Sequence, residues 1–148
     1  IETISSWSLA FTQINQILSA LLGGSFLFLF TLAMAHQDCD APILLTTLIC
    51  AGASTAALLV SELIQSSYLY ELTSSTTPLV EVFPQYPLFI AVSTLLLIAA
   101  VILTLLWKRQ GRLLSRKCAT IALVLALGGV FIARFSFYCA YLNVGLVV

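Results

Sequence analysis

Two opposite charges, Glu62 and Arg134, stand inside long apolar stretches of the sequence. A full charge at membrane depth costs about 2.5–3.5 kcal/mol, so it usually faces protein or water and has a partner. At about 1.5 Å rise per helical residue, the two positions lie within roughly one turn of the same depth. The spacing predicts a structural Glu62–Arg134 pair, direct or linked through water. The alternatives are a lining role in a quinone or proton route, or an Arg134 side chain that reaches the headgroups.

A second polar group opens the first apolar stretch, where Gln13, Asn15 and Gln16 follow one another closely. Amide side chains in a membrane helix most often form hydrogen bonds with neighbouring helices. Alternatively, these amides line a cleft that binds the headgroup of a quinol. Both interpretations stay open at this stage.

The remaining reactive side chains form no active-site pattern. His36 is the single histidine, and a position at the membrane interface is favoured over a metal site with Asp38, Cys39 and Asp40. The four cysteines have no C-x-x-C spacing, and we expect free thiols rather than a disulfide. No phosphate loop, nucleophile–base arrangement or iron–sulfur spacing is present. The sequence therefore predicts no metal site and no self-contained catalytic site.

The amino-acid composition indicates whether this chain lies in water or in lipid. Of 148 residues, 61% are hydrophobic and only 8% are charged, and the net charge is zero. Soluble domains are about 45–50% apolar and about 25% charged, so lipid is the expected surrounding. The zero net charge argues against a nucleic-acid partner.

Four apolar segments are long enough to cross the hydrocarbon core as helices. They predict an all-α integral membrane four-helix bundle, one domain over residues 1–148. None of them alternates as a barrel strand would. The expected helices cover approximately 11–35, 43–64, 88–107 and 119–141.

Basic residues predict the orientation of these helices. All Lys and Arg residues except Arg134 lie between the third and fourth segments. The positive-inside bias makes this link cytoplasmic. Links 36–42 and 108–118 are then cytoplasmic, and link 65–87 and both termini lie outside.

Small residues recur at four-residue spacing on these segments. Such positions let helix backbones approach closely in lipid. The pairs are Ser19-x-x-x-Gly23, Ala20-x-x-x-Gly24, Ala122-x-x-x-Ala126 and Gly129-x-x-x-Ala133, with a further small cluster at 51–57.

The C-terminal sequence resembles a known family. LALGGVFIARFSFYCAYLNVGLVV is similar to the end of the membrane anchor subunit of DMSO reductase, where an Arg precedes an aromatic–Tyr pair and a Gly. These are Arg134, Phe137, Tyr138 and Gly145 here. The resemblance also covers SELIQSSYLYELTSSTTPLVEVFPQY and WSLAFTQINQILSALLGGSFLFLF, and so nearly the whole chain.

The resemblance implies an anchor related to the NrfD and polysulfide-reductase family, built as two four-helix bundles. This chain resembles the second half, so its partners would be lipid, the N-terminal half of the anchor, an iron–sulfur subunit and a molybdopterin catalytic subunit. The implied location is the bacterial inner membrane, with periplasmic termini. Such anchors oxidise menaquinol without haem, and this segment would bind no cofactor of its own. Candidates for the quinol environment are Gln13, Gln16, Glu62, Arg134 and Tyr138.

Two other classes of protein have four membrane helices. A DsbB- or VKOR-like thiol oxidase needs a cysteine pair in an outer loop, and link 65–87 contains no cysteine. A tetraspan-like structural protein would need cysteines at the same place. The sequence therefore favours a non-catalytic anchor subunit of a multi-subunit oxidoreductase.

Overall fold

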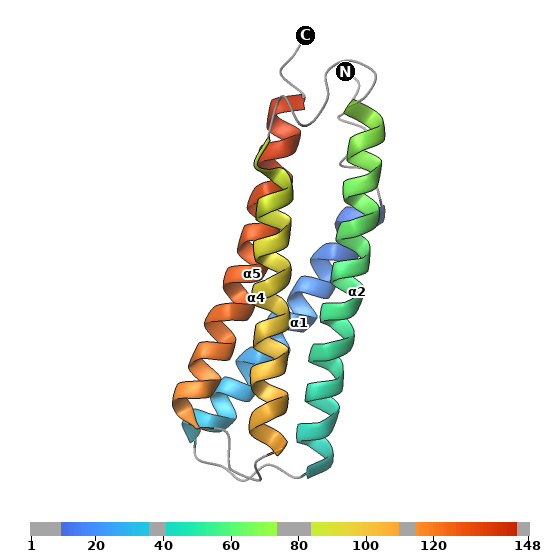
Figure 1. Ribbon diagram of the computed structural model, residues 1–148. Coiled ribbons are helices and arrows are strands. Elements are labelled where there is room, and N and C mark those ends of the chain that lie inside the picture. The colour runs from blue at the N-terminus through green and yellow to red at the C-terminus, as the bar shows by residue number, and fades with distance from the viewer. Residues whose placement is uncertain (1–9, 36–40, 74–83, 110–114, 145–148) are drawn as a thin grey trace.

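The chain folds into a bundle of four long helices in this computed structural model (Figure 1). The structure describes residues 10–35, 41–73, 84–109 and 115–144. No strand occurs among them, so the predicted all-α membrane bundle is confirmed. The helices are α1 (Ala10–Ala35), α2 (Ala41–Thr73), α4 (Tyr86–Arg109) and α5 (Arg116–Val144).

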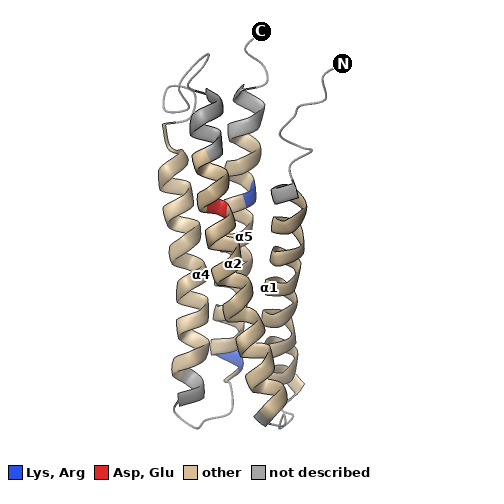
Figure 2. Ribbon diagram, turned by 90° about the vertical axis from the view of Figure 1, so that its right-hand side faces the viewer, with Lys and Arg blue, Asp and Glu red and all other residues tan. Residues whose placement is uncertain are grey.

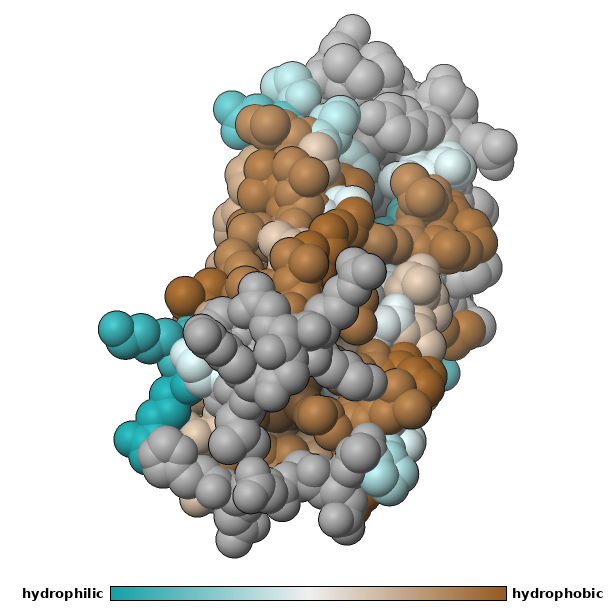
Figure 3. Space-filling model, turned by 60° about the horizontal axis from the view of Figure 1, so that its bottom comes forward, coloured by the Kyte–Doolittle hydropathy of each residue, from teal (hydrophilic) through white to brown (hydrophobic). Residues whose placement is uncertain are grey.

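Each helix contains a segment that is long and apolar enough to cross a membrane. Large apolar side chains cover the outside of the bundle: Phe131 is 69% exposed and Leu95 is 66% exposed. Most of the coloured atoms in Figure 3 are accordingly hydrophobic. In water such a surface would be unfavourable, whereas in lipid it is the expected exterior. The four spans are Thr12–Ala35, Pro42–Ser67, Tyr86–Leu106 and Arg116–Cys139.

The helix starts follow from local sequence. Pro42 and Pro87 fall in the first turns of α2 and α4, where a backbone N–H has no intrahelical acceptor to lose. At the start of α5, the Ser115 carbonyl accepts from the Ala119 N–H at 3.0 Å, and its hydroxyl accepts from the Cys118 N–H at 3.5 Å. Ser115 therefore acts as the N-cap of α5.

Two predicted links are shorter than expected. Residues 65–73, expected in the outer link, are helical, because α2 continues to Thr73. This stretch is polar but contains no Gly or Pro, so nothing interrupts the helix where it leaves the apolar layer. Similarly, α4 ends at Arg109 and α5 begins at Arg116, so the basic link 108–118 is partly helical. Arg and Lys are good helix formers whose charged ends can reach the interface from a helix.

Small residues form the inward face of α5. These residues repeat at alternating three- and four-residue steps, the spacing that keeps one seam of a helix facing its neighbours. The neighbouring helices contribute Leu22, Phe26, Leu58 and Leu97 to the buried cluster. Along most of α5, the inward face is therefore marked by small residues. The small buried α5 residues are Ala119, Ala122, Ala126, Gly129, Ala133 and Ser136, and Phe137 is a large side chain buried beside them.

The four helices are arranged as two hairpins. α4 packs most extensively against α5, and α1 packs mainly against α2. Between the hairpins, α1 contacts α5 substantially and α2 contacts α4 less. α2 and α5 consequently lie diagonally across the bundle. Any direct link between those two helices has to cross its interior.

Candidate functional site

Polar residues from three helices meet in the half of the bundle where α5 ends. Asn15 on α1, Glu62 and Gln65 on α2, and Arg134 on α5 line one small cavity of about 20 Å³. In Figure 2 an acidic and a basic segment lie side by side in that half, far from the basic segment at the opposite end. The site is thus built by long-range packing. Its remaining walls are Leu58, Tyr86, Ile90, Ala133 and Phe137.

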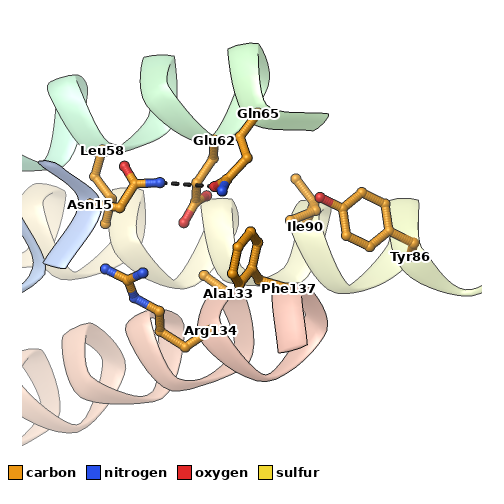
Figure 4. Close-up of a pocket in the computed structure, with 9 residues that line it drawn as sticks. All are labelled: Asn15, Leu58, Glu62, Gln65, Tyr86, Ile90, Ala133, Arg134 and Phe137. Carbon is orange, nitrogen blue, oxygen red and sulfur yellow. Dashed lines mark hydrogen bonds between the residues drawn. The ribbon is translucent and has the colours of Figure 1, made fainter. Parts of the chain in front are cut away.

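Two hydrogen bonds fix the edges of the cavity. Nδ2 of Asn15 donates to Oε1 of Gln65 at 2.9 Å, which joins α1 to α2 (Figure 4). Nη2 of Arg134 donates to Oγ of Ser19 at 3.1 Å, which joins α5 to α1. The Ser19 hydroxyl in turn donates to the Asn15 carbonyl at 2.6 Å. α1 is therefore held by polar contacts from both sides.

Glu62 and Arg134 face each other across this cavity without a direct hydrogen bond. Glu62 is only 8% exposed, and its Oε2 atom has no hydrogen-bond partner. In Figure 4 its carboxylate points from α2 toward the guanidinium of Arg134. The two charges attract each other electrostatically. The structure thus brings the two predicted residues together at one depth, while a direct pair between them stays a prediction.

Unsatisfied polar atoms concentrate around this site. Among the described side chains, every buried polar atom that lacks a partner belongs to the first two turns of α1 or to residues 61–65 of α2. Three of them lie on residues that line the cavity. Buried polar groups are normally paired, so such a cluster indicates a functional or hydrated site. The atoms are Oγ1 of Thr12, Oδ1 of Asn15, Oγ of Ser61, Oε2 of Glu62 and Nε2 of Gln65.

The structure separates the three amides that the sequence groups together. Asn15 is 2% exposed, whereas Gln13 and Gln16 are exposed on the outside of α1. Tyr138 is 42% exposed and does not line the cavity. The candidates Gln13, Gln16 and Tyr138 are therefore accessible from outside the bundle.

The remaining candidates are the histidine and the four cysteines. His36 and Cys39 lie outside the described residues. Cys50, Cys118 and Cys139 are free thiols, and none of these three lines the cavity.

Gln65 is the site residue that the sequence interpretation missed, because it was assigned to a link. A signal was available: Leu58, Glu62 and Gln65 follow at four- and three-residue steps, the helical spacing of one face. The same spacing distinguishes Asn15, which lies seven residues before Leu22 and eleven before Phe26. All of these residues are buried in the structure.

We expect Asn15→Ala to destabilise the bundle and Gln16→Ala to leave it unchanged. Loss of the Asn15–Gln65 hydrogen bond should cost about 1 kcal/mol, close to the average of about 0.6 kcal/mol for side-chain hydrogen bonds between membrane helices. Gln16 is exposed and serves as the matched control. Reversible unfolding in mixed lipid–detergent micelles measures both variants. Equal effects would contradict the inward placement of Asn15.

The fold and this site define a multi-pass integral membrane helical bundle. Comparison with protein families gives a match over residues 1–140 to the family described as DMSO reductase anchor subunit (DmsC). The chain belongs to that family, and is therefore a membrane anchor of a DMSO reductase-type complex. The predicted resemblance to the DMSO reductase anchor is confirmed. No curated protein and no solved structure matches the chain.

Proposed function

We propose that this chain anchors an iron–sulfur subunit and a molybdopterin catalytic subunit to the bacterial inner membrane and supports menaquinol oxidation by the complex. The family match over residues 1–140 carries this proposal. The four apolar spans supply the membrane attachment. Menaquinol is the substrate of the whole complex, and electrons pass from it to the partner subunits, without haem in this segment.

Two spaces in the structure differ in what they could accept. The polar cavity, at about 20 Å³, has room for a water-sized molecule but not for a two-ring quinol headgroup. An apolar groove between α1 and α2 is far larger, at about 860 Å³. We assign the quinol route to this groove, which opens toward lipid. Its α1 wall contains Ile17, Ala20, Leu21, Gly24, Ser25 and Phe28.

Gln13 supports that assignment by its position. It lies four residues before Ile17, seven before Ala20 and eleven before Gly24, which places it on the same face of α1 as the groove. An exposed amide at the end of an apolar groove can donate to a quinol oxygen. Glu62 and Arg134 then act inside the bundle rather than on the quinol.

Affinity purification of the native complex through the anchor tests the docking role. We expect the anchor to bring with it polypeptides that contain iron and molybdenum, detectable by metal analysis. Recovery of the anchor alone from gently solubilised membranes would contradict the proposal.

Substitution in the groove tests the quinol route separately. A Cβ at Gly24 would meet nothing within 4 Å, so Gly24→Leu should fill the groove without disturbing the fold. We expect at least a tenfold lower rate of DMSO reduction with a menaquinol analogue, and an unchanged rate with a soluble viologen donor. Ala99→Leu, at an exposed position on α4, is the control. If Gly24→Leu reduced DMSO with the menaquinol analogue at the normal rate, the groove would not be the quinol route. The anchor role would be unaffected by that result.

Single cysteines test the predicted orientation. In a cysteine-free background, Lys117→Cys at the basic end and Ser67→Cys on α2 are both at exposed positions. We expect an impermeant maleimide to label the second cysteine from the periplasm, and the first one only after the membrane is opened. The opposite pattern would contradict periplasmic termini.

A further inference from the structure

We propose that the cavity between Glu62 and Arg134 is a binding site for one ordered water molecule that completes the polar link across the bundle. Its volume is about 20 Å³. A single water needs about 10–15 Å³ of such space together with two to four polar partners. The space therefore suits one water molecule.

The unpaired atoms at the cavity supply the partners of this water. Oε2 of Glu62 and Oδ1 of Asn15 are acceptors without a donor, and Nε2 of Gln65 is a donor without an acceptor. These residues are 8%, 2% and 7% exposed, so bulk water does not satisfy them. The water donates to the two oxygens and accepts from Gln65 or from the guanidinium of Arg134. A buried water typically makes about three such bonds.

The number of hydrogen-bond donors and acceptors that face the cavity does not depend on which atom of each amide is oxygen and which is nitrogen. If both amides are turned over, the bond between Asn15 and Gln65 reverses its direction and is kept. One donor and one acceptor still face the cavity, with their owners exchanged. Water can satisfy either arrangement because it both donates and accepts.

The charges around the cavity favour water over a cation. A sodium or potassium ion would lie beside the guanidinium of Arg134 and the amide donor of Gln65, which both repel it. A neutral molecule with two donors and two acceptors fits the same surroundings. Through it, the carboxylate on α2 connects to Arg134 on α5, two helices that lie diagonally.

Cryo-electron microscopy of the intact complex in lipid nanodiscs, at a resolution that shows ordered waters, tests this site. We expect one density peak at about 2.7–3.2 Å from both Oε2 of Glu62 and the nearer atom of the Asn15 amide. A direct Glu62–Arg134 contact with no peak between them would overturn the proposal. So would a peak that appears only when sodium or potassium is present.

Infrared spectroscopy gives a second readout with matched variants. In hydrated membranes, exchange into oxygen-18 water should shift an O–H band of the bound water in the natural protein and in Gln16→Leu. The shift should be lost in Asn15→Leu, which fills the cavity, and in Gln65→Leu. Should either variant fail to fold, the other one decides. Retention of the shifted band in a folded cavity variant would contradict the proposed site.

Discussion

Replacement of Arg134 by Ala should lower the free energy of unfolding by about 2–3 kcal/mol, the range for loss of a hydrogen bond from a charged group inside a protein. The guanidinium donates to Ser19 and attracts the buried carboxylate of Glu62. Its removal leaves that carboxylate without a compensating charge. Unfolding of the purified anchor complex in mixed lipid–detergent micelles measures the loss.

Two controls distinguish the loss of the Glu62–Arg134 interaction from a general effect of removing a positive charge. Arg116→Ala removes an exposed arginine at the opposite end of α5 and should change stability by less than about 0.5 kcal/mol. In a double-mutant cycle, Glu62→Ala and Arg134→Ala should show a coupling of about 1–2 kcal/mol, as residues of one network do. Additive effects would instead mean that Arg134 reaches the headgroups independently of Glu62.

Replacement of Gly129 by Val should separate α4 from α5 and destabilise the bundle by about 2–3 kcal/mol, the upper range for an overfilled core. A Cβ at this position would lie 2.8 Å from Cγ of Leu97 and 3.1 Å from the backbone oxygen of Ser93. The Leu97 side chain can turn away, but the α4 backbone cannot without moving the helix. The contact between α4 and α5 is the most extensive in the bundle.

The adjacent glycine provides the control for this prediction. At Gly128 a Cβ would meet only Cδ1 of Leu96, at 4.0 Å, which is an ordinary contact. Gly128→Ala should therefore be neutral or stabilise α5 by up to about 1 kcal/mol, the difference in helix propensity between the two residues. If Gly129→Ala and Gly128→Ala behaved alike, close packing of α4 against α5 at this position would be contradicted.

The sequence alone predicts the membrane spans well, because hydrocarbon thickness sets a minimum length of apolar residues. It also predicts that Glu62 and Arg134 share a depth, because rise per residue is constant. The end of α2 could not be obtained in this way. Residues 65–73 are polar, and hydropathy marks where the apolar layer ends rather than where hydrogen bonding of the helix ends.

The inward faces are harder to predict from hydropathy. Apolar residues lie both outside and inside the bundle in lipid, so an apolar residue by itself does not report which side of a helix is buried. The size of the residues does report it, as the buried Ala and Gly positions of α5 show. The contacts of Asn15 with Gln65 and of Arg134 with Ser19 depend on how α1 crosses its neighbours. No spacing within one helix contains that information.

The placement of the two charges on different hairpins has a consequence for biogenesis. The α1–α2 hairpin carries Glu62 and the α4–α5 hairpin carries Arg134. Until the hairpins meet, each one presents an ionisable group to lipid, at a cost of about 2.5–3.5 kcal/mol. Association of the hairpins buries Glu62 and brings the partly buried Arg134 against Ser19 in one step. A half-assembled anchor thus differs from a finished one in the charge that it exposes to lipid.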